Sequence, residues 1–259
     1  MRNEQLLDHN SNHRFGKQKN NIPNFANRFE DSIKLPEVLF LTSYPPRECG
    51  IATYSQDLIR ALNNKFFNSF KLSICALESD NEKHEYNEEI KYKLNTDVIG
   101  AFAKLAKEIN EDPDISMVMI QHEFGFYAKR EFEFQQFLVA LDKPIILGFH
   151  TVLPKPNVSL RFNVNKIAAE SSSIVVMTKS SMKILVEDYG LTEEKITIIP
   201  HGTHLVEHQN KDLLKQKYNL EGKKVLSTFG LLSSGKNIET TIDALLKIVK
   251  QNKNVMFLI

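Results

Sequence analysis

The chain has 259 residues, of which 42% are hydrophobic and 25% are charged, so it is long enough for one large globular domain or for one domain and part of another. Its formal net charge of +1 argues against nucleic acid or an anionic membrane surface as the main partner. Its two cysteines exclude a disulfide scaffold and predict a reduced, cytoplasmic protein, and the lack of a run of about 18 apolar residues predicts no transmembrane segment.

Residues 1–34 are rich in Asn, Lys, Arg and His and show no sustained hydrophobic period. We expect them to form a disordered polar tail, because so little apolar surface cannot offset the entropy lost on ordering. This N-terminus also lacks the basic and then apolar pattern of a signal peptide, so secretion is not expected.

The stretch from Glu37 to Asn64 is the unit around which the rest of the chain is expected to be organised. An apolar run, Val38–Leu41, is followed by a Pro-Pro corner, by Gly50 and by apolar residues at helical spacing. A strand, a tight turn and a helix in succession place backbone N–H groups at the carboxyl edge of a parallel sheet, where anions bind. Many such units only connect a strand to a helix and bind nothing. A binding site is therefore predicted only if other motifs lie at the same edge of the sheet.

After this unit, short apolar runs alternate with longer helical patterns, which is typical of a parallel sheet covered by helices. Strands are predicted over 71–77, 89–94, 116–120, 144–149, 173–177 and 195–199. Helices are predicted over 97–109 behind a cap at Asp97, over 130–141, over 157–170, and over 179–189 behind a cap at Thr178. The acidic stretch 78–88 is expected to be a solvated loop.

His122 and His150 stand directly after two of these predicted strands, His122 in the run QHEFG and His150 in the run GFHT. Ligands of open α/β sheets bind beyond the carboxyl ends of the strands. Either histidine alone is equally compatible with a purely structural role. Together with the turn at Gly50, they predict a binding site at this edge.

The end of the chain predicts the start of a second domain. The first domain is expected over 35–202 and a polar connector over 203–222. Residues 223–259 hold one β-α-β pattern, with a strand at 224–229, a turn at 230–236, a helix at 237–250 and a strand at 255–259. Because one such piece cannot bury both faces of its sheet, we expect a truncated domain here.

In this order, the motifs YPPRECGIATYSQDL, QHEFG, GFHT, VVMTKSS, IIPHGTH and STFGLLSSGKNIE resemble those of retaining glycosyltransferases of the GT-B fold, specifically glycosyltransferase family 4. The resemblance covers nearly all of residues 37–259. It implies an α/β architecture, with a Rossmann-like doubly wound parallel sheet that binds the acceptor and a second Rossmann-like domain that binds most of the nucleotide-sugar donor. It also implies sugar transfer with retention of configuration, which requires no metal ion and no cofactor besides the nucleotide-sugar substrate.

Carried over to this chain, the resemblance implies catalytic roles for His150 and Lys236. Gly50 would lie in the glycine loop near the donor diphosphate, His150 would hydrogen-bond the transferred sugar near its reacting carbon, and Lys236 would neutralise the departing diphosphate. Looser assignments as contacts to the acceptor or sugar fall on Tyr44, Arg47, His122 and Glu123.

The chain departs from the family pattern in its second domain. Leu231 stands where many relatives have an arginine, and Asn237 stands where a glycine is common. The family's pair of glutamates that holds the donor sugar and ribose is absent from this chain. We therefore expect these 259 residues to be inactive alone.

Other functions stay open on the sequence. One alternative is a non-catalytic remnant, or an acceptor-binding module that docks a separately encoded C-terminal half. A nucleotide-sugar epimerase of the same fold is another, whereas a dinucleotide-binding oxidoreductase is disfavoured because no G-x-G-x-x-G follows the first strand. The acceptor class is open among glycans, lipids and small molecules, as is peripheral membrane contact.

Overall fold

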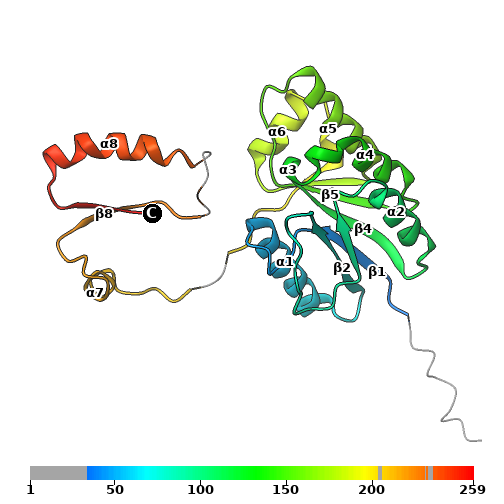
Figure 1. Cartoon of the computed structure of the whole chain (residues 1–259), viewed down its shortest axis with the longest axis horizontal. Helices are drawn as coiled ribbons and strands as arrows, with labels where there is room; N and C mark the ends of the chain where they lie inside the picture. Colours follow the sequence, from blue (N-terminus) through cyan, green and yellow to red (C-terminus); the bar gives the residue numbers. More distant parts are fainter. Residues whose placement is uncertain (1–33, 204–205, 231, 233–235) are drawn as a thin grey trace, which may run out of the picture. The chain divides into compact units, whose positions relative to one another are not determined.

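The computed structural model describes residues 34–203, 206–230, 232 and 236–259 (Figure 1). The predicted polar tail, apart from Lys34, and most of the turn predicted over 230–236 lie outside the described residues. The chain divides into two units at Lys34, and the elements below all belong to the unit Leu35–Ile259.

A seven-stranded parallel sheet forms the first part of this unit, in the order β3-β2-β1-β4-β5-β6-β7. Its strands are β1 (Glu37–Thr42), β2 (Lys71–Glu78), β3 (Tyr92–Asn95), β4 (Ile115–His122), β5 (Ile145–Phe149), β6 (Ser173–Val176) and β7 (Ile196–Ile198). The Rossmann-like doubly wound sheet predicted from the sequence is confirmed.

Helices cover both faces of this sheet (Figure 1). They are α1 (Gly50–Phe66), α2 (Ala101–Glu111), α3 (Phe124–Tyr127), α4 (Glu131–Ala140), α5 (Val158–Glu170) and α6 (Lys179–Glu187), with short 3-10 turns η2 (Ala128–Arg130) and η3 (Glu193–Lys195). Leu39 and Leu41 of β1 belong to the larger core with α2, α4, α5 and α6, whereas Phe40 packs with Ile59 of α1 on the other face. Because successive side chains alternate between two covered faces, the central residues of β1, 38–41, are all apolar.

The path of the chain through the sheet reverses between β1 and β4. From β1 the chain moves outward to β2 and β3, and it then returns to β4 on the other side of β1. The helix after β1 and the helices after β4 pack on opposite faces of the sheet. Such a reversal opens a crevice at the carboxyl ends of the two central strands, which is where ligands bind in sheets of this type.

The start of α2 differs from the prediction. Gly100, in a left-handed conformation with φ of 76°, is the N-cap of α2, and Asp97 is not. The carboxylate of Asp97 accepts hydrogen bonds from Lys129 Nζ at 3.0 Å and from the backbone N–H of Asp80 at 3.2 Å. A charged donor is a stronger partner for a carboxylate than a helix N–H, so Asp97 serves a tertiary contact. At α6, by contrast, the predicted cap is confirmed, since Thr178 Oγ1 accepts from the N–H of Ser181 at 2.9 Å.

The prediction of a solvated acidic loop over 78–88 is wrong for Glu78, whereas the side chains of Glu82 and Glu88 are 44% and 39% exposed but have partners in the chain. Glu78 is the last residue of β2 and is only 7% exposed. Glu82 pairs with Arg47, and Glu88 accepts a hydrogen bond from the hydroxyl of Tyr44. These long-range partners tie the segment to the loop after β1.

The second part of the chain holds α7 (Lys211–Lys217), β8 (Lys224–Ser227), α8 (Ile238–Gln251) and β9 (Val255–Leu258). Strands β8 and β9 pair in parallel, which confirms the predicted β-α-β piece. No residue of α8 is buried, and Phe229 is 91% exposed. That this piece is part of a larger domain stays a prediction.

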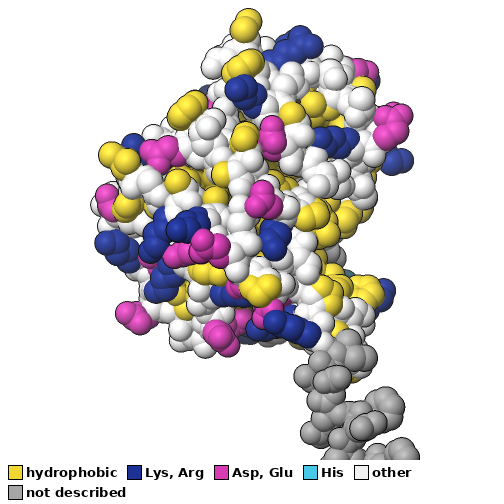
Figure 2. All heavy atoms as spheres, turned by 90° about the vertical axis from the view of Figure 1, so that its right-hand side faces the viewer, with side chains coloured by type: hydrophobic (Ala, Val, Ile, Leu, Met, Phe, Trp, Pro, Cys, Tyr) yellow, Lys and Arg dark blue, Asp and Glu magenta, His cyan; other side chains and the backbone are white. Residues whose placement is uncertain are grey.

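Charged side chains of both signs are interspersed on the face of the molecule seen in Figure 2. This distribution agrees with the net charge of +1. Within the described ranges, no helix is both long enough and apolar enough to cross a membrane.

Glu37, at the start of β1, is a buried carboxylate at the centre of an ion-pair network. Its carboxylate lies 2.6 Å from Lys91 Nζ and 3.5 Å from Lys71 Nζ, and Lys91 also lies 2.7 Å from Asp112. Burial acts to raise the pKa of Glu37, but the hydrogen bond from Lys91 and the charges of Lys91 and Lys71 together hold this pKa below its usual value.

Glu37→Ala is expected to lower the free energy of unfolding by about 1–3 kcal/mol, because a half-buried ammonium loses one of its two carboxylates. The matched control is Glu111→Ala, which removes an exposed i,i+4 pair with Lys107 at 3.7 Å and should cost less than about 0.5 kcal/mol. Urea unfolding followed by circular dichroism measures both changes. Equal losses in the two variants would contradict a structural role for Glu37.

Candidate functional site

Three of the sequence motifs meet at the carboxyl edge of the sheet. Tyr54, in α1, lies against the ring of His150 after β5, with ring centroids 5.0 Å apart. It also lies against the ring of His201 after β7, at 5.1 Å, and the two histidine rings are 6.2 Å apart. The start of α1 and the ends of β5 and β7 therefore present one cluster of ring side chains.

A groove of about 760 Å³ lies beside this cluster, between α1 and residues 199–203. Gly50, Tyr54 and His201 are among its lining residues. Cys49, the N-cap of α1, makes no side-chain hydrogen bond to the helix, and the first turn holds no acidic residue. A Cβ at Gly50 would meet no atom within 4 Å, so the backbone here is open to approach. An uncapped helix start with free N–H groups favours an anion.

His150 is held in place by Gln121. Its Nε2 lies 2.8 Å from Gln121 Oε1, and its backbone N–H donates to the carbonyl oxygen of His122 at 3.1 Å. Because an amide oxygen only accepts, Nε2 carries the proton and Nδ1 is left as an acceptor. Burial, with a smaller effect of His201, lowers the pKa of His150 to about 4, so the ring is neutral at pH 7. His150 is therefore suited to accept a hydrogen bond from a ligand hydroxyl.

Gln121 is a positioning residue that the sequence reasoning missed. Its side chain is fully buried near the end of β4, and its Nε2 has no hydrogen-bond partner in the part of the chain that the structure describes. A Cβ at Gly148 in β5 would lie only 2.8 Å from Gln121 Oε1, so the glycine leaves the space that the amide occupies. The available signal was a polar residue that directly follows the apolar run over residues 117–120.

Comparison with known proteins identifies the family. The family model described as Glycosyltransferase Family 4 matches residues 49–207, which is more than half of the chain. The chain belongs to glycosyltransferase family 4. No curated protein sequence matches it.

Two solved structures are similar to this chain. A glycosyltransferase from Rickettsia africae ESF-5 is 14% identical with a TM-score of 0.55, and the match covers 86% of this chain and 68% of that one. An α-glucosyltransferase in complex with UDP and a 13-mer DNA containing a central A:G mismatch is 11% identical with a TM-score of 0.47, and the match covers 86% of this chain and 56% of that one. At these identities the first comparison supports the Rossmann-like architecture and no finer conclusion.

In this family 4 chain, Glu123 ties together the ends of β4 and β5. Its Oε2 accepts a hydrogen bond from Thr151 Oγ1 at 2.6 Å, and its Oε1 accepts from the N–H of Phe124 at 3.1 Å. Thr151 directly follows His150, so the bond fixes the loop that carries the histidine. Both carboxylate oxygens of Glu123 thus have partners within the chain.

His122 is a core residue, and its expected contact with acceptor or sugar needs correction. It is 2% exposed and lies among the rings of four aromatic residues, Phe124, Tyr127, Phe134 and Phe149. Burial, with a smaller effect of His150, lowers the pKa of His122 to about 3. The ring borders only a small cavity of about 160 Å³ and does not join the cluster around Tyr54.

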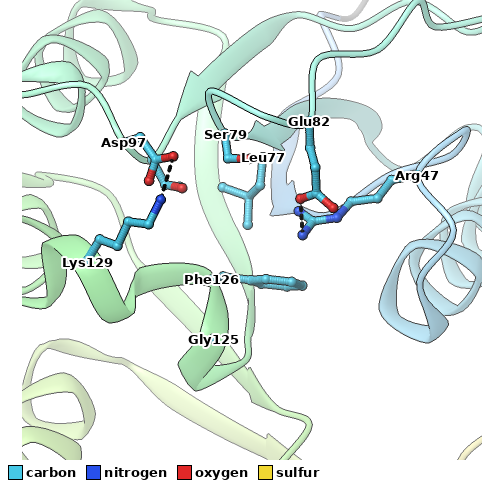
Figure 3. Close-up of a pocket in the computed structure, with 9 residues that line it drawn as sticks. Arg47, Leu77, Ser79, Glu82, Asp97, Gly125, Phe126 and Lys129 are labelled. Carbon is cyan, nitrogen blue, oxygen red and sulfur yellow. Dashed lines mark hydrogen bonds and ion pairs between the residues drawn. The ribbon is translucent and has the colours of Figure 1, made fainter. Parts of the chain in front are cut away.

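Tyr44 and Arg47 have partners within the chain. Tyr44 is 1% exposed and its hydroxyl donates to Glu88, which corrects the expectation that it contacts a ligand directly. Arg47 lies 2.6 Å from Glu82 and 5.1 Å from the ring centre of Phe126, where it lines a second pocket (Figure 3).

Lys236 lies in the second part of the chain, close to Gly230. A Cβ at Gly230, whose φ is 111°, would lie 3.5 Å from Lys236 Nζ. The neighbouring Asn237 adopts a left-handed conformation with φ of 48°, which asparagine tolerates better than most residues and which explains how it replaces the family's glycine. Leu231 lies outside the described residues. The role of Lys236 toward the donor stays a prediction.

Gln121→Glu is expected to raise the pKa of His150 from about 4, because a carboxylate within hydrogen-bond distance stabilises the imidazolium. An NMR titration of the imidazole resonances measures this pKa. The control is Gln135→Glu, at a buried glutamine of α4 that is bonded to Asn163, which should leave the titration of His150 in place. A pKa unmoved by Gln121→Glu would contradict the bond between the two side chains.

The lowered pKa values of His122 and His150 also predict that the folded state is less stable in acid. The pKa values of His122 and His150 fall from 6.5 to about 3 and about 4 in the folded chain. Between pH 6.5 and 4 the unfolded chain therefore binds more protons, and the free energy of unfolding falls on acidification by up to about 1.4 kcal/mol per pH unit for each histidine.

His122→Phe removes one of these contributions while keeping an aromatic ring in the core. Its urea midpoint is expected to change less between pH 6.5 and 4.5 than that of the unmutated protein. The exposed His208, replaced by Phe, is the control and should leave the pH dependence as it was. Parallel curves for His122→Phe and the unmutated protein would exclude His122 as a source of the effect.

Proposed function

We propose that this chain takes part in the transfer of a sugar, with retention of anomeric configuration, from a nucleoside-diphosphate sugar to a separate acceptor. The observation that carries the proposal is the convergence of Tyr54, His150 and His201 beside the uncapped start of α1. The helix start suits the diphosphate, and the neutral acceptor Nδ1 of His150 suits a sugar hydroxyl. Membership of family 4 supports this class of reaction.

In this reaction, negative charge develops on the departing diphosphate while the sugar becomes oxocarbenium-like. The chain's contribution is then positioning and electrostatic stabilisation. The N–H groups at Gly50 would face the diphosphate, His150 would orient the sugar, and Lys236 would supply a positive charge. The proposal requires neither a metal ion nor a covalent nucleophile.

His150→Ala is expected to lower kcat by roughly 10²–10³-fold, as the loss of one preorganised hydrogen bond in an active site does. The assay measures release of nucleoside diphosphate from UDP-, GDP- and ADP-sugars by the protein as its gene encodes it, including any residues beyond Ile259. His208→Ala is the matched control. Unchanged turnover in His150→Ala would contradict the role given to this residue.

A second candidate function is a non-catalytic module that docks a separate C-terminal half. Apolar side chains of the β8–α8–β9 piece favour it, since Leu246 is 66% exposed and Ile242 is 46% exposed. Size-exclusion chromatography with nucleotide titration separates the two functions. A chain that associates with a partner and binds no nucleotide alone would favour the module.

An epimerase of the same fold is distinguished by its product. It would convert one nucleotide sugar into another without releasing nucleoside diphosphate. The diphosphate-release assay therefore also decides between transfer and epimerisation.

The partners that we propose are a nucleotide sugar and a carbohydrate, lipid or small-molecule acceptor. The balanced charge supports the absence of nucleic acid from this set, although the α-glucosyltransferase structures contain DNA. Two free cysteines, of which Cys75 is buried, support a reducing, cytoplasmic location.

A further inference from the structure

A pocket of about 170 Å³ lies at the carboxyl ends of β2 and β3. Figure 3 shows Arg47 and Glu82 on one side of it and Asp97 and Lys129 on the other, with Phe126 between the two pairs. These residues come from segments far apart in the sequence that the reversal of the sheet brings together. Of these residues, the sequence predicted a ligand contact only for Arg47, and it assigned Asp97 to a helix cap.

The charges of this pocket neutralise one another. Arg47 Nη2 lies 2.6 Å from Glu82, and Lys129 Nζ lies 3.0 Å from Asp97. Hydrogen bonds from Lys129 and from the backbone of Asp80 hold the pKa of Asp97 below its usual value, so this carboxylate stays ionised. With two cations and two anions in contact, the pocket offers little net attraction to a charged ligand. Each pair nevertheless offers both donors and acceptors to a hydroxyl group.

Phe126 supplies a small apolar surface between the two polar pairs. Its ring is half-buried, and the guanidinium of Arg47 lies over the ring at 5.1 Å from its centre, so a ligand would contact the part of the ring that Arg47 leaves uncovered. A pyranose ring matches this combination, because its faces carry C–H groups and its rim carries hydroxyls that both donate and accept. Aromatic rings bordered by a few polar groups are a common way to bind such a ligand.

The size and position of the pocket limit the ligand further. Drug-sized ligands occupy pockets of roughly 300–1,000 Å³, so this pocket suits a single ring. Phe126 belongs to α3, which is capped by Glu123, and Glu123 bonds to Thr151 beside His150. The pocket and His150 thus share one edge of the sheet.

We propose that this pocket binds one neutral sugar ring of the acceptor, with the ring on Phe126 and its hydroxyls bonded to the Arg47–Glu82 and Lys129–Asp97 pairs. The inference rests on the proposed glycosyltransferase function and narrows its acceptor to a carbohydrate.

Saturation-transfer difference NMR with the methyl glycosides of glucose, galactose and mannose tests this binding. For at least one of them, transfer to the ring C–H protons is expected, with an at least fivefold loss in Phe126→Ala. Phe132→Ala is the matched control, because Phe132 is 71% exposed on α4 and should leave the signal in place.

Gly125→Leu is a second variant that keeps the test independent of folding defects. A Cβ at Gly125, which lines the pocket, would meet no atom within 4 Å, so the backbone there has room for a side chain, and a leucine is expected to reduce the space of the pocket. Its melting temperature, checked by circular dichroism, should match that of the unmutated protein while the saturation transfer is lost.

Three results would overturn the pocket assignment. They are no saturation transfer to any of the glycosides, equal transfer in both pocket variants and the unmutated protein, or displacement of the glycoside by inorganic phosphate. Turnover of a nucleotide sugar is measured separately on the unmutated protein as its gene encodes it, including any residues beyond Ile259. Turnover without glycoside binding overturns the pocket alone, whereas glycoside binding that depends on Phe126, without turnover, supports the pocket and overturns the proposed function.

Discussion

The parallel pairing of β1 with β4 is the constraint on which the arrangement of this chain depends. These strands are neighbours in the sheet although β2, β3 and their connections separate them in sequence. The pairing sends α1 to one face and α4 to the other, and both begin at the same edge. A single long-range contact therefore brings the start of α1, the strand-end histidines and the pocket at Phe126 to one side of the sheet.

The surroundings of His150 and of Phe126, both at this edge, differ in their electrostatics. Around His150, burial removes charge, and the neutral ring is oriented by an uncharged amide. Around Phe126, charge is kept but balanced, with each cation in contact with a carboxylate. The first arrangement leaves the helix start of α1 as the main attraction for an anion, and the second favours uncharged polar ligands.

The strands were predictable because a parallel strand covered on both faces must be apolar throughout, as Leu39, Phe40 and Leu41 are. Because ligands bind beyond the carboxyl ends of such strands, the sequence also predicted the candidate site at this edge of the sheet. The partners of the loop carboxylates were not predictable from the sequence. Glu82 and Asp97 belong to no periodic pattern, and each pairs with a residue more than thirty positions away. Nor did the sequence separate the core histidine, His122, from His150, because both follow an apolar strand and only packing distinguishes them.

Gly148 shows how closely β4 and β5 depend on each other. The space that a side chain at Gly148 of β5 would fill is occupied by the side-chain amide of Gln121 of β4. A larger residue at 148 would displace the amide of Gln121 and so disturb its bond to His150. Keeping His150 in this orientation therefore requires both Gln121 and the space beside Gly148, so residues in two neighbouring strands are constrained together.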